Sequence, residues 1–332
     1  MDIVTQGIAG ATCAQAIADR RNGRLAALVG LAAGLLPDAD ALIYSAEDPL
    51  VQLEFHRHFS HALVFIPVGA GVAALLFWLL LRRSVSLKKL YFYSICGYAS
   101  GGLLDACTSY GTHLFWPFVQ QPVAWSVIAI VDPVFTLLLV VPLAIGLRQR
   151  RPLRVGLVLA LAYLLLGAVQ HERAEVAARK MAGERGHEPQ QLLVKPTVGN
   201  LILWRSVYIF EDSVRVDGVR VGLGVRIYPG EQRLLFEPGR DLGGATPGSR
   251  AYRDAVRFGE SASGFVVRYP QEGMRIGDAR YAMLPTEIEP LWGMEFDRDD
   301  MEEAPRWITS RSITADRRRR FFGMLRGREL GE

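Results

Sequence analysis

The chain has 332 residues, which is enough for two domains, and half of its residues are hydrophobic. Its 38 Lys and Arg residues outnumber its 34 Asp and Glu residues, giving a formal net charge of +4. The basic residues form short clusters between apolar runs, without zinc-finger spacing or a dinucleotide fingerprint, so the charge does not indicate a nucleic-acid partner. All three cysteines precede residue 108, which excludes a disulfide framework in the second half.

Apolar runs of membrane-spanning or nearly spanning length fill the first half of the chain. About 20 helical residues cross a bilayer core, and the run at 3–18 is shorter and weaker than the others. We predict a membrane α-helical domain of about five to six helices over residues 1–171. The stronger runs lie at residues 25–44, 62–81, 90–107, 126–147 and 153–170.

The loops between these runs predict the orientation of the domain, because Lys and Arg of short loops stay on the cytoplasmic side. Basic loops alternate with loops at 45–61 and 108–125, which hold one arginine between them. We therefore place the basic loops inside and the other two outside. With six helices, both ends of the chain face outward. The basic loops lie at residues 19–24, 82–89 and 148–154.

The second half, residues 172–332, is predicted to be a soluble extracytoplasmic domain. A charged, helix-like stretch at 171–186 is typical of a stalk. Runs rich in Val, Ile and aromatic residues, broken by Gly and Pro, then predict a β-rich or α+β fold. These runs lie at 200–211, 214–228, 264–270 and 279–285. The basic stretch at 316–330 is either a solvated tail or a helix on anionic lipid.

Four segments that are distant in sequence carry Asp and His residues to the outer side of the predicted membrane domain. One of them, Glu54-Phe-His-Arg-His-Phe-Ser-His61, holds three of the chain's six histidines. Each candidate lies in an outer loop or at the outer end of a helix, so a shared metal site is their simplest common purpose. The candidates are Asp38, Asp40, His56, His61, Asp105 and Asp132.

A bound cation explains why acids are tolerated at this position. A carboxylate deep in a spanning helix costs roughly 2.5 to 3.5 kcal/mol, whereas each Leu or Ile returns roughly 0.3 to 0.6 kcal/mol. Neighbouring carboxylates also repel one another. A divalent cation removes both penalties, and His nitrogen with Asp oxygen ligands suits Zn, Mn or Fe.

Several of these residues also have simpler local interpretations. Pro37-Asp38 is typical of a turn or cap, and Asp132 before Pro133 is typical of a helix start. Ser60 is predicted to be the N-cap of the third helix. Arg57 suits either a substrate phosphate or a salt bridge to one of the acids.

The same residues form a family pattern. The chain has Met1-Asp2 with Thr5-Gln6, Pro37-Asp38 with Asp40, His56-Arg57 with Ser60-His61, and Leu103-Leu104-Asp105 with Thr108 and Gly111. This pattern resembles the YdjM-like inner-membrane proteins, and most closely a long subgroup with a C-terminal soluble domain. The resemblance implies a metal-dependent hydrolase. The resemblance is firm to about residue 150. It implies a multi-pass protein of the bacterial inner membrane.

Two positions depart from that pattern. Gly101 stands where many relatives have a histidine, and Gln6 stands where they have a histidine near the N-terminus. The resemblance therefore implies either one metal in place of two or a site that has lost its activity.

The leading hypothesis is a membrane-bound metal-dependent hydrolase that acts on phosphoester-type, lipid-linked substrates at the outer face of the inner membrane. In this hypothesis Asp40 takes a proton and Arg57 neutralises a phosphate. A catalytically silent membrane scaffold stays open as an alternative. A metal or ion transporter is disfavoured, because the cytoplasmic halves of the helices offer no polar path. The predicted metal ligands are His56, His61, Asp105, Asp38 and Asp132.

Overall fold

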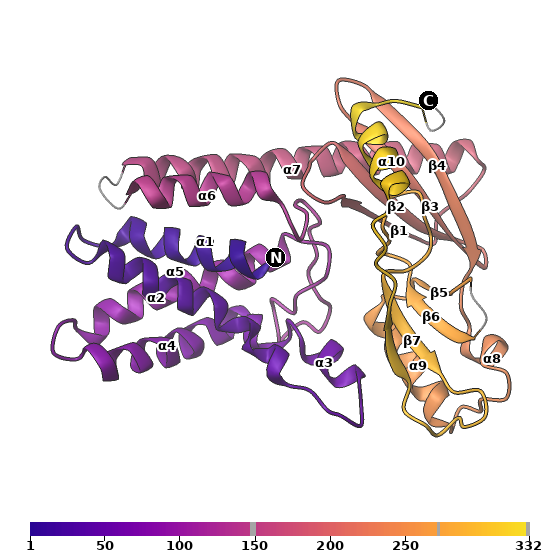
Figure 1. The fold of residues 1–332 in the computed structure, drawn as a ribbon, viewed down its shortest axis with the longest axis horizontal. Helices are drawn as coiled ribbons and strands as arrows, with labels where there is room; N and C mark the ends of the chain where they lie inside the picture. Colours follow the sequence, from indigo (N-terminus) through magenta and orange to yellow (C-terminus); the bar gives the residue numbers. More distant parts are fainter. Residues whose placement is uncertain (147–150, 271–272, 330–332) are drawn as a thin grey trace. The chain divides into compact units, whose positions relative to one another are not determined.

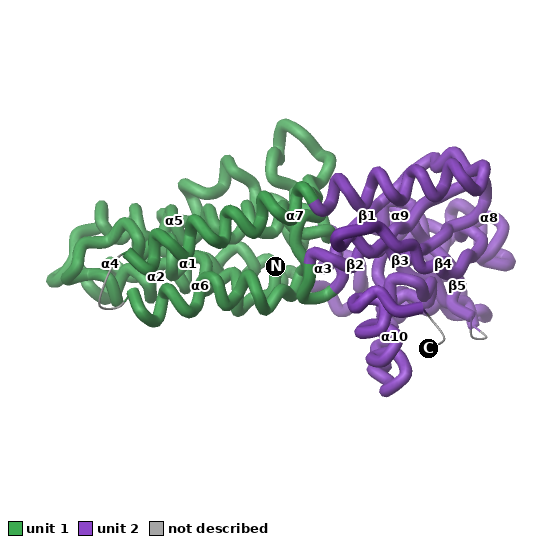
Figure 2. The backbone as a smooth tube through the Cα atoms, turned by 90° about the horizontal axis from the view of Figure 1, so that it is seen from above, with its two compact units in different colours: residues 1–43, 55–169, 198–200 green, residues 44–54, 170–197, 201–332 purple. Residues whose placement is uncertain are grey.

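A computed structural model covers the chain, and the described residues are 1–146, 151–270 and 273–329. Part of the predicted basic loop at 148–154, residues 148–150, therefore lies outside the described residues. The last residue of the stretch at 316–330 also lies outside them. The chain divides into two compact units, coloured separately in Figure 2. Unit 1 comprises Met1–Ile43, Phe55–Val169 and Val198–Asn200, and unit 2 comprises Tyr44–Glu54, Gln170–Thr197 and Leu201–Glu332.

Unit 1 is helical, as the apolar runs predict. Among the described residues, two helical stretches are long and apolar enough to cross a membrane, and three helices are apolar but shorter. The count of five to six spanning helices therefore stays a prediction. The elements are α1 (Ile3–Ile17), α2 (Gly23–Leu35), the 3₁₀ helices η1 (Pro37–Leu42), η2 (Phe59–His61) and η3 (Leu63–Phe65), α4 (Ile66–Leu81), α5 (Leu87–Ala106), α6 (Pro133–Gly146) and the first part of α7 (Arg151–Glu184) (Figure 1).

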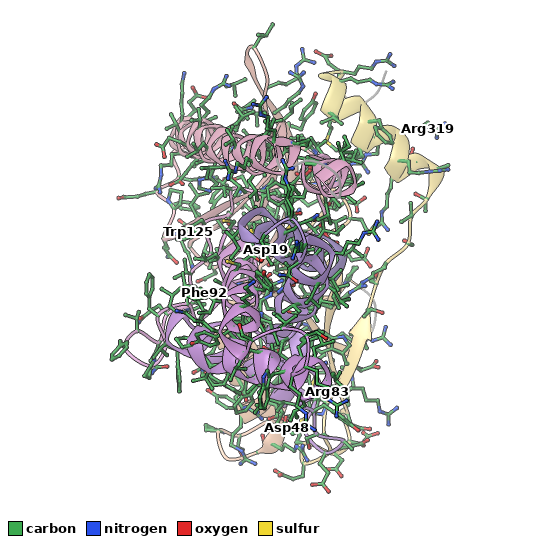
Figure 3. The ribbon with its side chains drawn as sticks, turned by 90° about the vertical axis from the view of Figure 1, so that its left-hand side faces the viewer. Asp19, Asp48, Arg83, Phe92, Trp125 and Arg319 are labelled. Carbon is green, nitrogen blue, oxygen red and sulfur yellow. The ribbon has the colours of Figure 1, made fainter. Side chains whose placement is uncertain are left out.

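The apolar surface of these helices faces outward. Val158, Leu161 and Leu165 of α7 are exposed, as is Phe92 of α5, which is labelled in Figure 3. Apolar side chains on the outside of a helix are suited to lipid. The predicted span at 153–170 and the predicted stalk at 171–186 form one continuous helix, α7, of 34 residues.

Glycines allow α1, α2 and α5 to pack with their backbones in contact. A Cβ atom added to Gly10 would lie 2.3 Å from the carbonyl oxygen of Gly30, and one added to Gly97 would lie equally close to that oxygen. Small residues at helix contacts permit such an approach in membrane proteins. The packing brings the first turn of α1 and the last turns of α2 and α5 together at one end of unit 1.

Unit 2 contains two antiparallel sheets, each of four strands, which bears out the prediction of a β-rich part. The first sheet has the order β1-β2-β3-β4 and the second the order β5-β6-β7-β8. The strands are β1 (Gln191–Pro196), β2 (Leu203–Phe210), β3 (Ser213–Val221), β4 (Val225–Leu234), β5 (Val266–Arg268), β6 (Met274–Asp278), β7 (Trp292–Phe296) and β8 (Arg306–Thr309); the helices are α3 (Leu50–Phe55), α8 (Pro238–Asp241), α9 (Arg250–Ser261) and α10 (Ala315–Arg326).

The second part of α7 covers the first sheet. Ala174 and Ala178, one helical turn apart, pack against Trp204 of β2 and Val219 of β3. The other face of β2 packs against residues of the second sheet, so the strand is buried on both faces. This double burial agrees with the six apolar residues among its eight, with Arg205 and Ser206 as buried exceptions.

Two expectations for the second half are wrong. Residues 279–285 form no strand, because the guanidinium of Arg205 donates to the carbonyl oxygens of Ala279 (2.8 Å) and Leu284 (3.0 Å) and holds the segment as a buried loop. The stretch at 316–330 is no solvated tail, since its residues to Arg326 belong to α10. Met324 of that helix is buried against Tyr228 of β4.

The segment Tyr44–Glu54 belongs to unit 2, although it comes from the first half of the sequence. Leu50 is fully buried in the core that α9 forms with the second sheet. Arg257 of α9 donates to both carboxylate oxygens of Glu54, at 2.8 and 3.0 Å, and lies 2.9 Å from Asp48. The segment is therefore held by one apolar anchor and one branched ion pair.

Candidate metal centre

The cluster of Asp and His residues lies within unit 1, on two short 3₁₀ helices and the last turn of one α-helix. Helix α2 ends at Leu35, and Pro37 begins the 3₁₀ helix η1, which carries Asp38 and Asp40. The predicted run at 25–44 thus ends early as an α-helix, because Pro37 has no N–H to donate to the carbonyl group four residues earlier. His61 lies on η2, and Asp105 lies in the last turn of α5.

Asp40 organises the cluster through four hydrogen bonds. Its Oδ1 atom accepts from Nδ1 of His56 at 2.9 Å, while Oδ2 accepts from the backbone N–H of Arg57 at 2.9 Å. Oδ2 also accepts from the hydroxyl of Ser60 at 2.6 Å and lies 3.2 Å from Nδ1 of His61. Ser60 is therefore not the predicted helix N-cap, since its hydroxyl serves this carboxylate.

His61 presents its other ring nitrogen to two more carboxylates. Its Nε2 atom lies 3.2 Å from Oδ1 of Asp38 and 3.1 Å from Oδ2 of Asp105. Ligand atoms on a tetrahedral cation with bonds of about 2.0 to 2.1 Å are about 3.3 Å apart. The two distances from Nε2 therefore match two edges of such a tetrahedron, and all three ligand atoms lie within 4.8 Å of one another.

Asp105 is fully buried and is surrounded by positive charge. Arg57 approaches its Oδ1 atom at 3.0 Å, and the same guanidinium donates to Oγ1 of Thr108 at 3.0 Å. The α-amino group of Met1 forms a second ion pair with Asp105. Arg57 has a φ of 60°, in the left-handed region that non-glycine residues rarely adopt. Of the two interpretations of Arg57, a phosphate ligand or a salt bridge, the contacts in the structure are those of the salt bridge.

A glycine brings His61 next to Asp105. A Cβ atom added to Gly102 would lie 2.7 Å from the carbonyl oxygen of His61, so any other residue there would separate η2 from α5. The hydroxyl of Tyr98 donates to the carbonyl oxygen of Ser60 at 2.7 Å and holds the same loop from the preceding turn of α5.

The protonation of the loop residues reflects this crowding. Burial acts to raise the pKa of Asp40, but hydrogen bonds from His56, His61 and Ser60 outweigh it and hold that pKa below its usual range. Burial acts to lower the pKa of His61, but its contacts with Asp105, Asp38 and Asp40 raise that pKa to about 10. Without a metal ion, the protonated imidazole of His61 therefore supplies a positive charge that offsets the neighbouring carboxylates.

Two groups of side chains have the composition and spacing to hold a cation. They are Asp38, His61 and Asp105, and Asp38, Asp40 and His56, and within each group one ligand atom per residue lies within 4.8 Å of the others. Asp38 is common to both. The side chain of His56 is 28% exposed and that of Asp38 is 18% exposed, so the cluster opens to its surroundings there.

The two departures from the family pattern lie against each other. A Cβ atom added to Gly101 would lie 2.9 Å from Nε2 of Gln6, so Gln6 fills the space that a side chain at position 101 needs. Nε2 of Gln6 donates to Asp105 at 3.5 Å, and its buried Oε1 atom has no hydrogen-bond partner among the described residues. An unpartnered buried oxygen on a side chain that contacts Asp105 fits a cation or its water as partner.

Asp132 is not part of either group. Its Oδ1 atom accepts from the backbone N–H of Phe135 at 3.0 Å, and its Oδ2 atom accepts from the hydroxyl of Tyr163 at 2.9 Å. These contacts are those of a helix N-cap on α6. The structure brings together the other five predicted residues and Arg57, and it adds Gln6, Ser60 and Thr108, which sequence reasoning did not assign to the site.

Searches of curated proteins and of solved structures found no match to this chain. A scan against protein-family models matched one family, described as YdjM inner membrane protein, over residues 1–174. The matched region holds the whole Asp and His cluster and more than half of the chain. The chain therefore belongs to the YdjM inner membrane protein family.

Proposed function

We propose that the chain is a metal-dependent hydrolase of phosphoester-type, lipid-linked substrates, with its site at the outer face of the bacterial inner membrane. The observation that carries the proposal is the convergence of three carboxylates and two imidazoles in one partly buried cluster. Asp38 is the carboxylate common to both groups of candidate ligands, and its partial exposure leaves a way in for a cation. The family membership supports the membrane part of the proposal and leaves the reaction open.

Asp38, His61 and Asp105 would hold the cation, a Zn, Mn or Fe ion. When bound, a cation of this kind lowers the pKa of a water ligand to near neutral and polarises the scissile oxygen. Asp40 orients His61 from behind, since it accepts from Nδ1 and leaves Nε2 directed at Asp38 and Asp105. Such outer partners fix the tautomer and rotamer of a ligand histidine.

His56 and Asp40 would move the proton. A carboxylate only accepts hydrogen bonds, so Nδ1 of His56 carries the proton that Asp40 receives, and Nε2 is left as the basic atom. A histidine held in a fixed orientation is suited to general acid–base catalysis. This division gives His56 a proton-transfer role in place of the ligand role predicted from the sequence.

Arg57 would stabilise the ionised form of Asp105 and bind the substrate phosphate. Its guanidinium spans Asp105 and Thr108, and its Nε atom has no hydrogen-bond partner among the described residues. A planar guanidinium binds phosphate oxygens well, and because the Arg57 side chain is only 6% exposed, a phosphate would reach it only from within the cluster.

The membrane threading is also part of the proposal. Six helices, α1, α2, α4, α5, α6 and the first part of α7, would cross the membrane and place the cluster and unit 2 outside the cytoplasm. A reporter fused to the C-terminus tests this orientation, and a cytoplasmic signal would reverse it.

The deciding experiment is elemental analysis of detergent-purified protein, with wild type beside His61→Ala and Asp132→Asn. We expect near-stoichiometric Zn, Mn or Fe in wild type and Asp132→Asn, and its loss in His61→Ala. A stoichiometry of two would assign His56 to a second ion. Absence of metal from reconstituted wild type would remove the hydrolase proposal and favour the silent scaffold.

The substrate class is tested on the metal-loaded protein with phosphoesters of increasing lipid character. Hydrolysis that persists in an Asp105→Ala, His61→Ala double variant would show that the reaction takes place elsewhere.

A further inference from the structure

We infer that the tip of the β3–β4 hairpin, with the C-terminal end of α10, is a contact surface for anionic phospholipid at the end of the α7 span. The surface is defined by Leu223, Arg173, Arg226, Arg326 and Arg328, all in unit 2. It rests on membrane insertion of α7 and is independent of the metal centre.

The hairpin tip presents an unusually exposed aliphatic side chain. The sequence Gly222-Leu223-Gly224 joins β3 to β4, and Leu223 is 110% exposed, while Val225 beside it is 53% exposed. Neither glycine offers a side chain to shield the leucine. An aliphatic residue held out by a rigid hairpin is suited to insertion among acyl chains.

Hydrogen bonds tie this tip to the residues of α7 that directly follow its apolar stretch. The amide of Gln170 donates to the carbonyl oxygen of Val221 at 2.9 Å, and the guanidinium of Arg173 donates to that of Gly222 at 2.9 Å. The apolar run of α7 ends at Gln170. A helix that crosses the bilayer to this point therefore holds the hairpin tip at the depth of the headgroups.

The arginines gather at the same place. Arg226 of β4 donates to the carbonyl oxygen of Gly327 at 2.5 Å, and Arg220 of β3 donates to that of Leu325 at 2.9 Å, so the end of α10 is fixed beside the tip. Figure 1 shows α10 lying along these strands. Arg173, Arg226, Arg326 and Arg328 are all exposed, against the exposed acids Glu172 and Glu329.

Charge and shape together specify the ligand. Exposed guanidinium groups around an aliphatic tip match phosphate headgroups above acyl chains, and basic residues near an anionic leaflet are attracted to it. Arg319, labelled in Figure 3, is exposed one to two turns earlier on α10 and extends the basic face along the helix.

The test uses the full chain in nanodiscs that contain equal amounts of phosphatidylglycerol and phosphatidylcholine. A photoreactive benzoylphenylalanine replaces Leu223, and lipid adducts are identified by mass spectrometry after illumination. The matched control carries the same group at Leu234, which is 62% exposed at the opposite end of the same strand pair, where it faces Ser213. At about 3.3 Å per residue, the two sites lie about 30 Å apart.

We expect lipid adducts at position 223 and few at position 234, with phosphatidylglycerol favoured roughly fivefold, the preference expected of one basic residue at an anionic surface. Arg226→Gln with Arg328→Gln should lower that ratio, with Arg173 and Arg326 still in place, while total adduct formation persists. Equal labelling by both lipids in the unsubstituted background would overturn the charge recognition. Adducts only to a second copy of the chain, or equal lipid labelling at 223 and 234, would overturn the surface itself.

Discussion

The substitution Asp40→Asn separates the two tasks assigned to this carboxylate. Four donors surround its oxygens: Nδ1 of His56 at Oδ1, and the Arg57 amide, the Ser60 hydroxyl and Nδ1 of His61 at Oδ2. An asparagine satisfies most of them when its oxygen occupies the Oδ2 position. Its amino group then faces His56 and forces that ring to carry its proton on Nε2.

The expected magnitudes differ for metal binding and for catalysis. His61 keeps a neutral acceptor but loses the charge behind it, and loss of such an outer partner costs about 10- to 100-fold in metal affinity, or about 1.4 to 2.8 kcal/mol. His56 loses its basic nitrogen toward the substrate, so metal-saturated turnover should fall further, by about 10²-fold or more. The rate deficit should therefore remain at saturating metal.

The assay is competition of the purified protein with a chromogenic chelator, followed by turnover at saturating metal. Asp132→Asn is the matched control, because it removes the same charge from a buried aspartate that caps α6. We expect it to leave thermal stability nearly unchanged, because Asn caps a helix about as well as Asp, and to leave metal affinity unchanged. Metal affinity in Asp40→Asn within roughly twofold of wild type, or equal losses in both variants, would refute the reasoning.

Three further substitutions test other parts of the structure. Burial and the nearby Arg205 hold the pKa of Lys195 well below its usual value of 10.5, so between the lowered pKa and 10.5 the unfolded chain binds more protons than the folded one. The melting temperature should rise with pH across that window, and Lys195→Met should remove this rise relative to wild type. Gly101→Ala should cost about 1 to 3 kcal/mol in stability, because its Cβ meets Gln6, and Gln6→Ala should return part of the loss in a double-mutant cycle. Arg257→Ala should lower the free energy of unfolding by about 1 kcal/mol and speed limited proteolysis within residues 44–54. Arg253 is an exposed neighbour on α9, and equally fast cleavage in Arg253→Ala would show a general effect of the helix.

The sequence carried most of the information about the metal centre. Asp38, Asp40, His61 and Asp105 stand out because charged residues at the edge of apolar runs need partners, and those partners lay in other segments at the same predicted depth. Asp132 also lies at the edge of an apolar run, but its role is to cap helix α6, as a carboxylate before a proline often does. Gln6 and Ser60 could not be assigned, because their roles depend on Gly101 and Asp40, which only packing brings to them.

Element boundaries followed backbone chemistry more than hydrophobicity. The run at 25–44 is uniformly apolar until Pro37 ends the α-helix. The segment 279–285 is as apolar as a strand, yet its carbonyl groups are satisfied by the distant Arg205. The strands β6 and β7 were missed because each contains a glycine, Gly277 and Gly293, where the two backbones approach closely.

The position of Leu50 has a consequence for the order of events during synthesis. The ribosome produces the segment Tyr44–Glu54 about two hundred residues before α9. Leu50 of this segment packs into the core that α9 forms. At about 5 to 20 residues per second, that segment stays without its final neighbours for about 10 to 40 s. His56 lies two residues after this segment, so the chain next to the cluster loop gains its anchor only once α9 and the second sheet have been made. A premature stop before α9 would therefore leave the cluster residues present but the neighbouring segment untethered.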